Sequence, residues 1–165
     1  MSTLQDAGRL ALAESVVAQS LYLAWGRGRP AWDGTPEPEP SDATALVDEV
    51  GRRLATHVGY CKPVSDPALP AEIELPGNAR YTASAQPTPW VYVRVVFDFA
   101  EADGETLREF GLFIGSQPKA GLPAGQRYFT PAQIEKQGRL YLIDRVQAFT
   151  RSGHVRNTVE YVLPF

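Results

Sequence analysis

A proline-rich segment near the N-terminus constrains the fold of this chain more than any other feature. Trp25–Asp33 reads WGRGRPAWD, and Thr35–Pro40 then reads TPEPEP. Each proline lacks an amide hydrogen and restricts the residue before it, so this stretch forms neither a helix nor a central strand. The tryptophans on both sides of the turn indicate that packing of their rings holds the turn in place. The sequence therefore predicts an ordered, extended arm at about residues 25–41, and such an arm favours assembly over chemistry.

Length and composition predict one domain over residues 1–165, which is large enough to fold without a disulfide or a metal. The single Cys61 has no partner in the chain. A net charge of −3 and a pI near 5.4 disfavour a nucleic-acid-binding protein. We expect no signal peptide and no membrane span, because neither a basic start nor about 18 consecutive apolar residues is present. Synthesis in the cytosol follows as an expectation from the lack of a disulfide framework.

The order of elements predicts an α+β fold, with an antiparallel, meander-like sheet, two short N-terminal helices and long Pro/Gly-rich loops. The first helix starts at Ser2 or Thr3 with a capping box to Gln5, and the second starts at Ser41 or Asp42 and weakens at Gly51. Strands are predicted at residues 20–25, 90–99, 107–115, 140–149 and 155–163. The Asp103-Gly104 dipeptide predicts a hairpin between the strands at 90–99 and 107–115.

Candidate chemical groups are few. His57 and Cys61 have a spacing that suits a metal on a helix, but the segment is predicted to be extended, so we expect no metal and no cofactor. The acidic residues Asp48, Glu49, Glu101 and Asp103 are interpreted as solvated charges on a helix face and in a turn. No serine lies in the context of a nucleophile elbow. The chain is therefore not expected to be an enzyme or to bind a small-molecule substrate.

Two further motifs have structural interpretations. GRGRP at residues 26–30 lacks the spacing of either phosphate-binding glycine motif, and Pro30 removes an amide that a phosphate would need. In the strand at 107–115, Glu109 needs a partner if its side chain faces inward, and an arginine is the expected partner in a structural ion pair.

Four segments together resemble small tail proteins of tailed bacteriophages, including baseplate and tail-fibre-attachment components. These segments are LYLAWGRGRPAWDG at 21–34, EVGRR at 49–53, REFGLFIG at 108–115 and GRLYLIDRVQAF at 138–149, and the resemblance covers residues 19–60 and 90–163. Fibre proteins of this kind continue into long shafts, so a chain that ends at Phe165 is expected to be a short adaptor. The resemblance implies a structural virion protein in the tail, present in several copies, with other tail proteins as partners.

The residues expected to contact partners are aromatic and basic. Tryptophans act as anchors and arginines pair with acidic surfaces; these residues are Trp25, Arg27, Arg29, Trp32, Arg52 and Arg53. The alternative is a carbohydrate-binding module whose exposed aromatic rings stack on glycans of the host surface.

Overall fold

The computed structural model describes residues 2–35 and 37–165. Residue 36, within the predicted arm, lies outside the described residues. The chain forms two compact units, each built from separated segments. Unit 1 comprises Met1–Gln19, Thr56–Val95 and Thr158–Phe165, and unit 2 comprises Ser20–Ala55 and Val96–Asn157. The expectation of a single domain over 1–165 stays a prediction.

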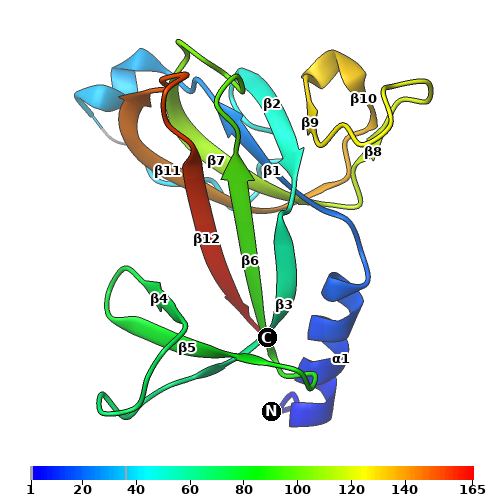
Figure 1. Ribbon diagram of the computed structural model, residues 1–165, viewed down its shortest axis with the longest axis vertical. Helices are drawn as coiled ribbons and strands as arrows, with labels where there is room; N and C mark the ends of the chain where they lie inside the picture. The colour runs from blue at the N-terminus through cyan, green and yellow to red at the C-terminus, as the bar shows by residue number, and fades with distance from the viewer. Residues whose placement is uncertain (1, 36) are drawn as a thin grey trace. The chain divides into compact units, whose positions relative to one another are not determined.

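Unit 2 contains a five-stranded sheet in the order β11-β7-β1-β2-β9 (Figure 1). Its strands are β1 (Leu21–Gly26), β2 (Glu49–Leu54), β7 (Thr106–Ile114), β9 (Tyr128–Phe129) and β11 (Arg139–Thr150). The short strands β8 (Gln117–Pro118) and β10 (Ile134–Lys136) form a separate pair, and the 3-10 helices η1 (Pro30–Asp33) and η2 (Pro131–Gln133) lie in the loops. Every strand pair with a described register in this unit is antiparallel.

The centre of this sheet is apolar on both faces. All six residues of β1 are buried, and seven of the nine residues of β7 are buried as well. A strand that is covered on both faces reads as a continuous apolar run, which is the pattern of LYLAW and FGLFI. Tyr22, Ala24, Leu46, Phe113 and Phe129 form one cluster of this core.

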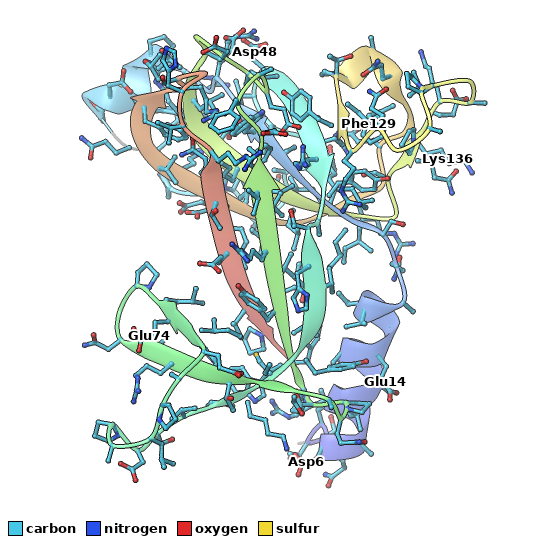
Figure 2. All side chains as sticks on the ribbon, in the orientation of Figure 1. Asp6, Glu14, Asp48, Glu74, Phe129 and Lys136 are labelled. Carbon is cyan, nitrogen blue, oxygen red and sulfur yellow. The ribbon has the colours of Figure 1, made fainter. Side chains whose placement is uncertain are left out.

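Unit 1 contains the helix α1 (Asp6–Val17) and most of a second five-stranded sheet. That sheet has the order β12-β6-β3-β5-β4 and consists of β3 (His57–Pro63), β4 (Ile73–Leu75), β5 (Ala79–Ser84), β6 (Trp90–Phe97) and β12 (Asn157–Pro164). Side chains of β6 alternate, with Val91, Val93, Val95 and Phe97 buried, as the sequence predicted for this strand. Figure 2 shows Asp6 and Glu14 on α1, and both are exposed.

The prediction of a second N-terminal helix is wrong. Among the described residues α1 is the one α-helix, and residues 41–48 form turns and bends before β2 begins. Asp48 has a φ of 56°, a left-handed conformation that a helix does not tolerate. The Val47 amide donates to the carboxylate of Glu109 rather than to a carbonyl one turn back. Tertiary contacts with β7 therefore override the helical pattern of ALVDEV.

The start of the first helix also differs from the prediction. The N-cap is Gln5 rather than Ser2 or Thr3, and no side chain caps the helix. Gln5 Nε2 donates instead to the carbonyl of Thr3. In the part of the chain that the structure describes, no helix has the length and apolar character that crossing a membrane requires.

The predicted hairpin between the strands at 90–99 and 107–115 is wrong although both strands form. β6 and β7 belong to different sheets, so the turn at Asp103-Gly104 connects the sheets instead of closing a hairpin. β11 and β12 are likewise in different sheets. In each case a strand from a distant part of the sequence takes the predicted partner's place: β1 and β11 flank β7, and β3 and β12 flank β6.

Candidate functional site: the arm and its cleft

Two arginines fix the arm on unit 2. Arg108 of β7 binds Asp33 in a bidentate ion pair, with 2.7 Å from Nε to Oδ1 and 2.8 Å from Nη2 to Oδ2. Its Nη1 also donates to the carbonyl of Arg27 at 3.0 Å. Arg145 of β11 donates to the carbonyl of Pro38 at 2.7 Å, and its Nη1 lies 3.4 Å from Glu37 Oε2. We call Arg108 and Arg145 the clasp arginines.

The Arg108–Asp33 pair is electrostatically strong. The guanidinium of Arg108 lowers the pKa of Asp33, and the carboxylate raises the pKa of Arg108 in turn. A bidentate pair of this type also sets the orientation of both groups. Within the predicted extended arm, residues 30–33 form the 3-10 helix η1 and are not extended, and the order of the arm as a whole stays a prediction.

Gly28 permits the turn of the arm. Its φ is +59°, and a Cβ atom at this position would lie 2.4 Å from the Trp32 ring. Only glycine combines this backbone conformation with so close an approach. Gly28 of GRGRP thus allows Trp32 to pack closely against the backbone, in line with the structural interpretation of that motif.

Trp32 is buried beneath the second clasp arginine. Its exposed fraction is 8%, and the guanidinium carbon of Arg145 lies 4.1 Å from its ring centroid. Such a cation–π contact is stabilising when both groups are shielded from water. The indole Nε1 is itself buried and has no hydrogen-bond partner among the described residues.

Trp25 has a different position from Trp32. It lies in β1, is fully buried, stacks on Phe97 with 3.5 Å between ring centroids, and donates from Nε1 to Tyr128 Oη at 3.0 Å. Burial raises the pKa of Tyr128 to about 12. Trp25 is therefore part of the core of unit 2. Its predicted contact with a partner stays a prediction, and no part of its ring is exposed in this structure.

The four arginines expected to contact partners all have acidic partners within the chain. Arg27 binds Glu105 at 2.6 Å and Asp48 at 2.9 Å, and the hydrogen bond to Glu105 raises the pKa of Arg27. Arg52 is 2% exposed and binds Glu49 at 2.7 Å. It also donates to Ser116 Oγ at 2.8 Å and to the Gln137 carbonyl at 2.7 Å.

The remaining two arginines differ in exposure. Arg53 forms an ion pair with Glu101 in which both side chains are largely buried, and burial raises the pKa of Glu101. Arg29 is 60% exposed and lies 3.6 Å from Glu37. Of the four, Arg29 has the loosest and most accessible pair.

These pairs correct the interpretation of several acidic residues as solvated charges. Glu49 and Glu101 each have a side chain only 11% exposed, and each binds an arginine. Asp103 accepts a hydrogen bond from the Gly153 amide at 2.6 Å. Asp48, labelled in Figure 2, and Asp103 are both exposed, as expected for solvated charges, although Asp48 lies in a turn and not on a helix.

The side chain of Glu109 faces inward, which is the orientation for which the sequence predicted a partner. Its side chain is fully buried, and burial raises its pKa. The expected arginine ion pair is wrong, because Arg108 binds Asp33 and Glu109 Oε1 accepts from the Val47 amide. Glu109 Oε2 has no hydrogen-bond partner among the described residues.

A cleft of about 380 Å³ lies between the arm and β11. Trp32, Asp33 and Glu37 line it from the arm, and Val146, Gln147 and Ala148 line it from β11. The clasp arginines complete the lining. No pattern in the sequence indicated Arg145, because its contacts with Glu37 and Pro38 join residues more than a hundred positions apart and depend on tertiary structure.

The residues considered for catalysis and metal binding do not come together. His57 is exposed and tilts against Tyr92, and Cys61 is buried, with a pKa raised to about 11 by burial. Among residues 2–35 and 37–165, no group of three or more His, Cys, Asp or Glu side chains is arranged to hold a metal ion. Trp25 and Trp32 are buried and Trp90 is half-buried, whereas the aromatic side chains of Phe99 and Tyr141 are exposed, so the carbohydrate-binding alternative stays a prediction.

Comparison with known protein families decides the class of the chain. Residues 1–165 match the family described as baseplate wedge 3 tail fiber network component. The chain belongs to this family. A search of curated proteins found no match.

Membership of the family confirms the resemblance to phage tail and baseplate proteins. The chain is a structural component of a bacteriophage baseplate, located in the virion tail, and it interacts with other tail proteins. The segments that carried the resemblance are β1 with the arm, β2, β7 and β11. All four lie in unit 2, which also holds the clasp and the cleft.

Proposed function

We propose that the chain is a non-enzymatic adaptor of the baseplate that docks neighbouring tail subunits through its arm. Several copies per particle act together, and no nucleic acid, cofactor or small-molecule substrate takes part. The protein is made in the cytoplasm of the host bacterium and is then built into the tail. The net charge of −3 and the membership of a baseplate family support this proposal.

The observation that carries the proposal is the way in which the arm is held. Arg108 binds Asp33 through two hydrogen bonds, and Arg145 covers Trp32. These contacts hold described residues of the arm against β7 and β11, which favours an arm that is ordered before any partner binds. Pre-organisation lowers the entropy cost of association, which suits a surface that must assemble repeatedly.

Arg29 is the side chain of the arm with the greatest freedom to pair with an acidic neighbour. It is 60% exposed, and its contact with Glu37 at 3.6 Å is loose. An exposed pair of this kind contributes little to folding. Its charge is therefore available for recognition at small cost to the fold.

The test is charge reversal at Arg29 with a matched control. Arg94 of unit 1 is also exposed and has a loose pair, 3.9 Å from Glu160. Wild-type and variant chains carrying different tags are co-expressed during infection, and their ratio in purified particles is measured. We expect Arg29→Glu to be depleted at least tenfold and Arg94→Glu to be incorporated at close to the wild-type level. Equal incorporation of both variants would contradict docking through the arm.

A further inference from the structure

The cleft between the arm and β11 is electrically balanced. Both oxygens of Asp33 accept hydrogen bonds from Arg108, and Glu37 pairs with Arg145. The four charged residues of the lining thus form two ion pairs with no net charge. A charged ligand would gain no net attraction here and would still lose its hydration, so the cleft favours an uncharged occupant.

The polar groups without partners near the cleft include two donors. Trp32 Nε1 and Arg145 Nε are buried, and within the described part of the chain neither has an acceptor. Both residues line the cleft, and their side chains lie against each other. Orphaned buried donors are rare in folded proteins and call for an explanation. An occupant that brings an oxygen acceptor would supply what these donors lack, and a peptide carbonyl is the common uncharged acceptor of this type.

The strand that lines the cleft, β11, has features that favour pairing with a strand from another chain. β11 is at the edge of its sheet, and its register with β7 passes from Arg145 opposite Glu109 to Phe149 opposite Leu107. The register therefore skips Val146, Gln147 and Ala148, which are the cleft residues of this strand. The Arg145 amide donates to Glu39 of the arm at 3.4 Å, so this edge of β11 faces the arm. Edge strands and bulges are typical places for the addition of a strand from another chain.

We propose that the cleft binds an uncharged, extended peptide segment of a neighbouring baseplate protein. The segment pairs its backbone with the irregular part of β11 at residues 146–148 and presents a carbonyl oxygen to Trp32 Nε1. Arg145 shifts from the Trp32 ring as the segment enters, because the guanidinium covers the indole in the free chain. This inference rests on the proposed docking function and names its binding site and the chemistry of the partner.

Photo-crosslinking in assembled particles tests the proposal. Gln147 is exposed and is replaced by p-benzoylphenylalanine; the same residue replaces Arg29 on the arm and Glu74, an exposed residue of unit 1 that is labelled in Figure 2. After irradiation of purified baseplates, the crosslinked peptides are identified by mass spectrometry. We expect position 147 to crosslink to another tail protein, within a segment that has no charged residue next to the crosslink.

Each other outcome has a definite meaning. Crosslinks from position 29 but none from 147 would overturn the cleft site and leave docking by the arm intact. Crosslinks from position 147 into a segment dense in charges would overturn the uncharged partner. Crosslinks from position 74 alone would overturn both the cleft and the arm. No crosslink from any position to a tail protein would overturn the proposed function itself.

A second measurement isolates the indole donor. Trp32→Phe keeps an aromatic ring beneath Arg145 but removes the N–H, and Trp90→Phe, at a half-buried tryptophan of β6, is the matched control. In the tagged competition during infection, the loss of one hydrogen bond predicts about tenfold depletion of Trp32→Phe relative to Trp90→Phe. Equal ratios for both variants, with equal thermal stability of the free chains, would overturn the role of Trp32 Nε1.

Discussion

Arg52 forms an ion pair with Glu49 inside unit 2, with 2.7 Å between Nη2 and Oε2. Its guanidinium also lies 3.9 Å from the ring centroid of Phe113. In the sequence the pair is part of EVGRR, which resembles a segment of phage tail proteins. In the structure this arginine connects β2 to the core and to the chain around Ser116.

Removal of Arg52 is expected to destabilise the folded protein. Arg52→Met leaves the carboxylate of Glu49 largely buried and unpaired, so the free energy of unfolding should fall by roughly 3–5 kcal/mol. Urea-induced unfolding measures the difference. Arg29→Met, at an exposed pair, is the control and should change the free energy of unfolding by less than about 1 kcal/mol. Similar small losses for both variants would contradict the structural role of Arg52.

The two tryptophans of the arm are expected to act differently. Trp25→Ala opens a cavity beside Phe97 and should lower the free energy of unfolding of the free chain by roughly 3–5 kcal/mol. Trp32→Ala should lower it less, because Trp32 packs against the arm and Arg145 rather than in the centre of the sheet. Incorporation of Trp32→Ala into particles should fall by more than its stability explains. Equal losses of stability and of assembly for Trp32→Ala would count against its role as an anchor.

Gly51 is predicted to tolerate no side chain. A Cβ atom there would lie within 2.9 Å of the Phe129 carbonyl and closer still to Tyr128, which accepts the hydrogen bond from Trp25. Gly51→Ala should destabilise the chain by about 1–3 kcal/mol, the range for overpacked cores. Gly34→Ala is the control, because nothing lies within 4 Å of that position and its φ is −100°. Thermal unfolding should show a clear loss for the first variant and no loss for the second.

The buried carboxyl group of Glu109 should make stability depend on pH. Burial raises its pKa above the ordinary value of 4.5, so the unfolded chain releases this proton before the folded chain does. The wild-type protein therefore loses stability as the pH rises from 4.5 through the raised pKa, and Glu109→Gln does not. The free energy of unfolding of the variant should thus increase relative to wild type over this window and stay constant above it.

Glu72→Gln provides a control of opposite sign for this titration. Hydrogen bonds from the Ala83 amide and the Thr82 hydroxyl lower the pKa of Glu72, so its contribution to stability is present above the ordinary pKa and is lost as the pH falls. Relative to wild type, Glu72→Gln should become less stable as the pH rises. Parallel pH profiles for the two variants, measured by urea unfolding, would contradict the raised pKa of Glu109.

Cys61 should be inert in the folded chain. Its side chain is fully buried, and burial raises its pKa to about 11, so almost no thiolate forms at neutral pH. Titration with Ellman's reagent should detect no thiol in the native protein and one thiol per chain in urea. Rapid reaction of the native protein would show that the sheet around Cys61 opens.

Local patterns in the sequence predicted the strands better than their partners. The alternation in WVYVRVVF and the apolar run in LYLAW identified β6 and β1. The reason is that burial of one or both faces of a strand determines which of its residues are apolar. The Asp103-Gly104 dipeptide predicted a hairpin that does not form, since β1 and β11 pair with β7 in place of β6. Turn chemistry acts over a few residues, whereas the choice of a partner strand depends on the burial of whole faces.

The candidate site, too, was predicted from the sequence only in part. The sequence indicated an ordered arm and singled out Trp32 and Arg29, because tryptophan, glycine and proline have strong local preferences. It did not indicate Arg145, and it suggested the wrong partner for Glu109. Both outcomes depend on tertiary contacts. The register places Arg145 opposite Glu109, but it is the Val47 amide that donates a hydrogen bond to the Glu109 carboxylate.

The sequence predicted a proline-restricted arm, because the restriction that proline places on the backbone is local. Its motifs resembled those of phage tail proteins, and the family match confirms that resemblance. Tertiary contacts determined how tightly each of the arginines is held within the protein. Arg27 and Arg53 pair with carboxylates distant in the sequence, and Arg52 pairs with Glu49 of its own strand and donates to Ser116 and Gln137. Arg29 has a loose, exposed pair with Glu37. The physical reason is that an ion pair depends on distance and burial in space, and neither is set by separation along the sequence.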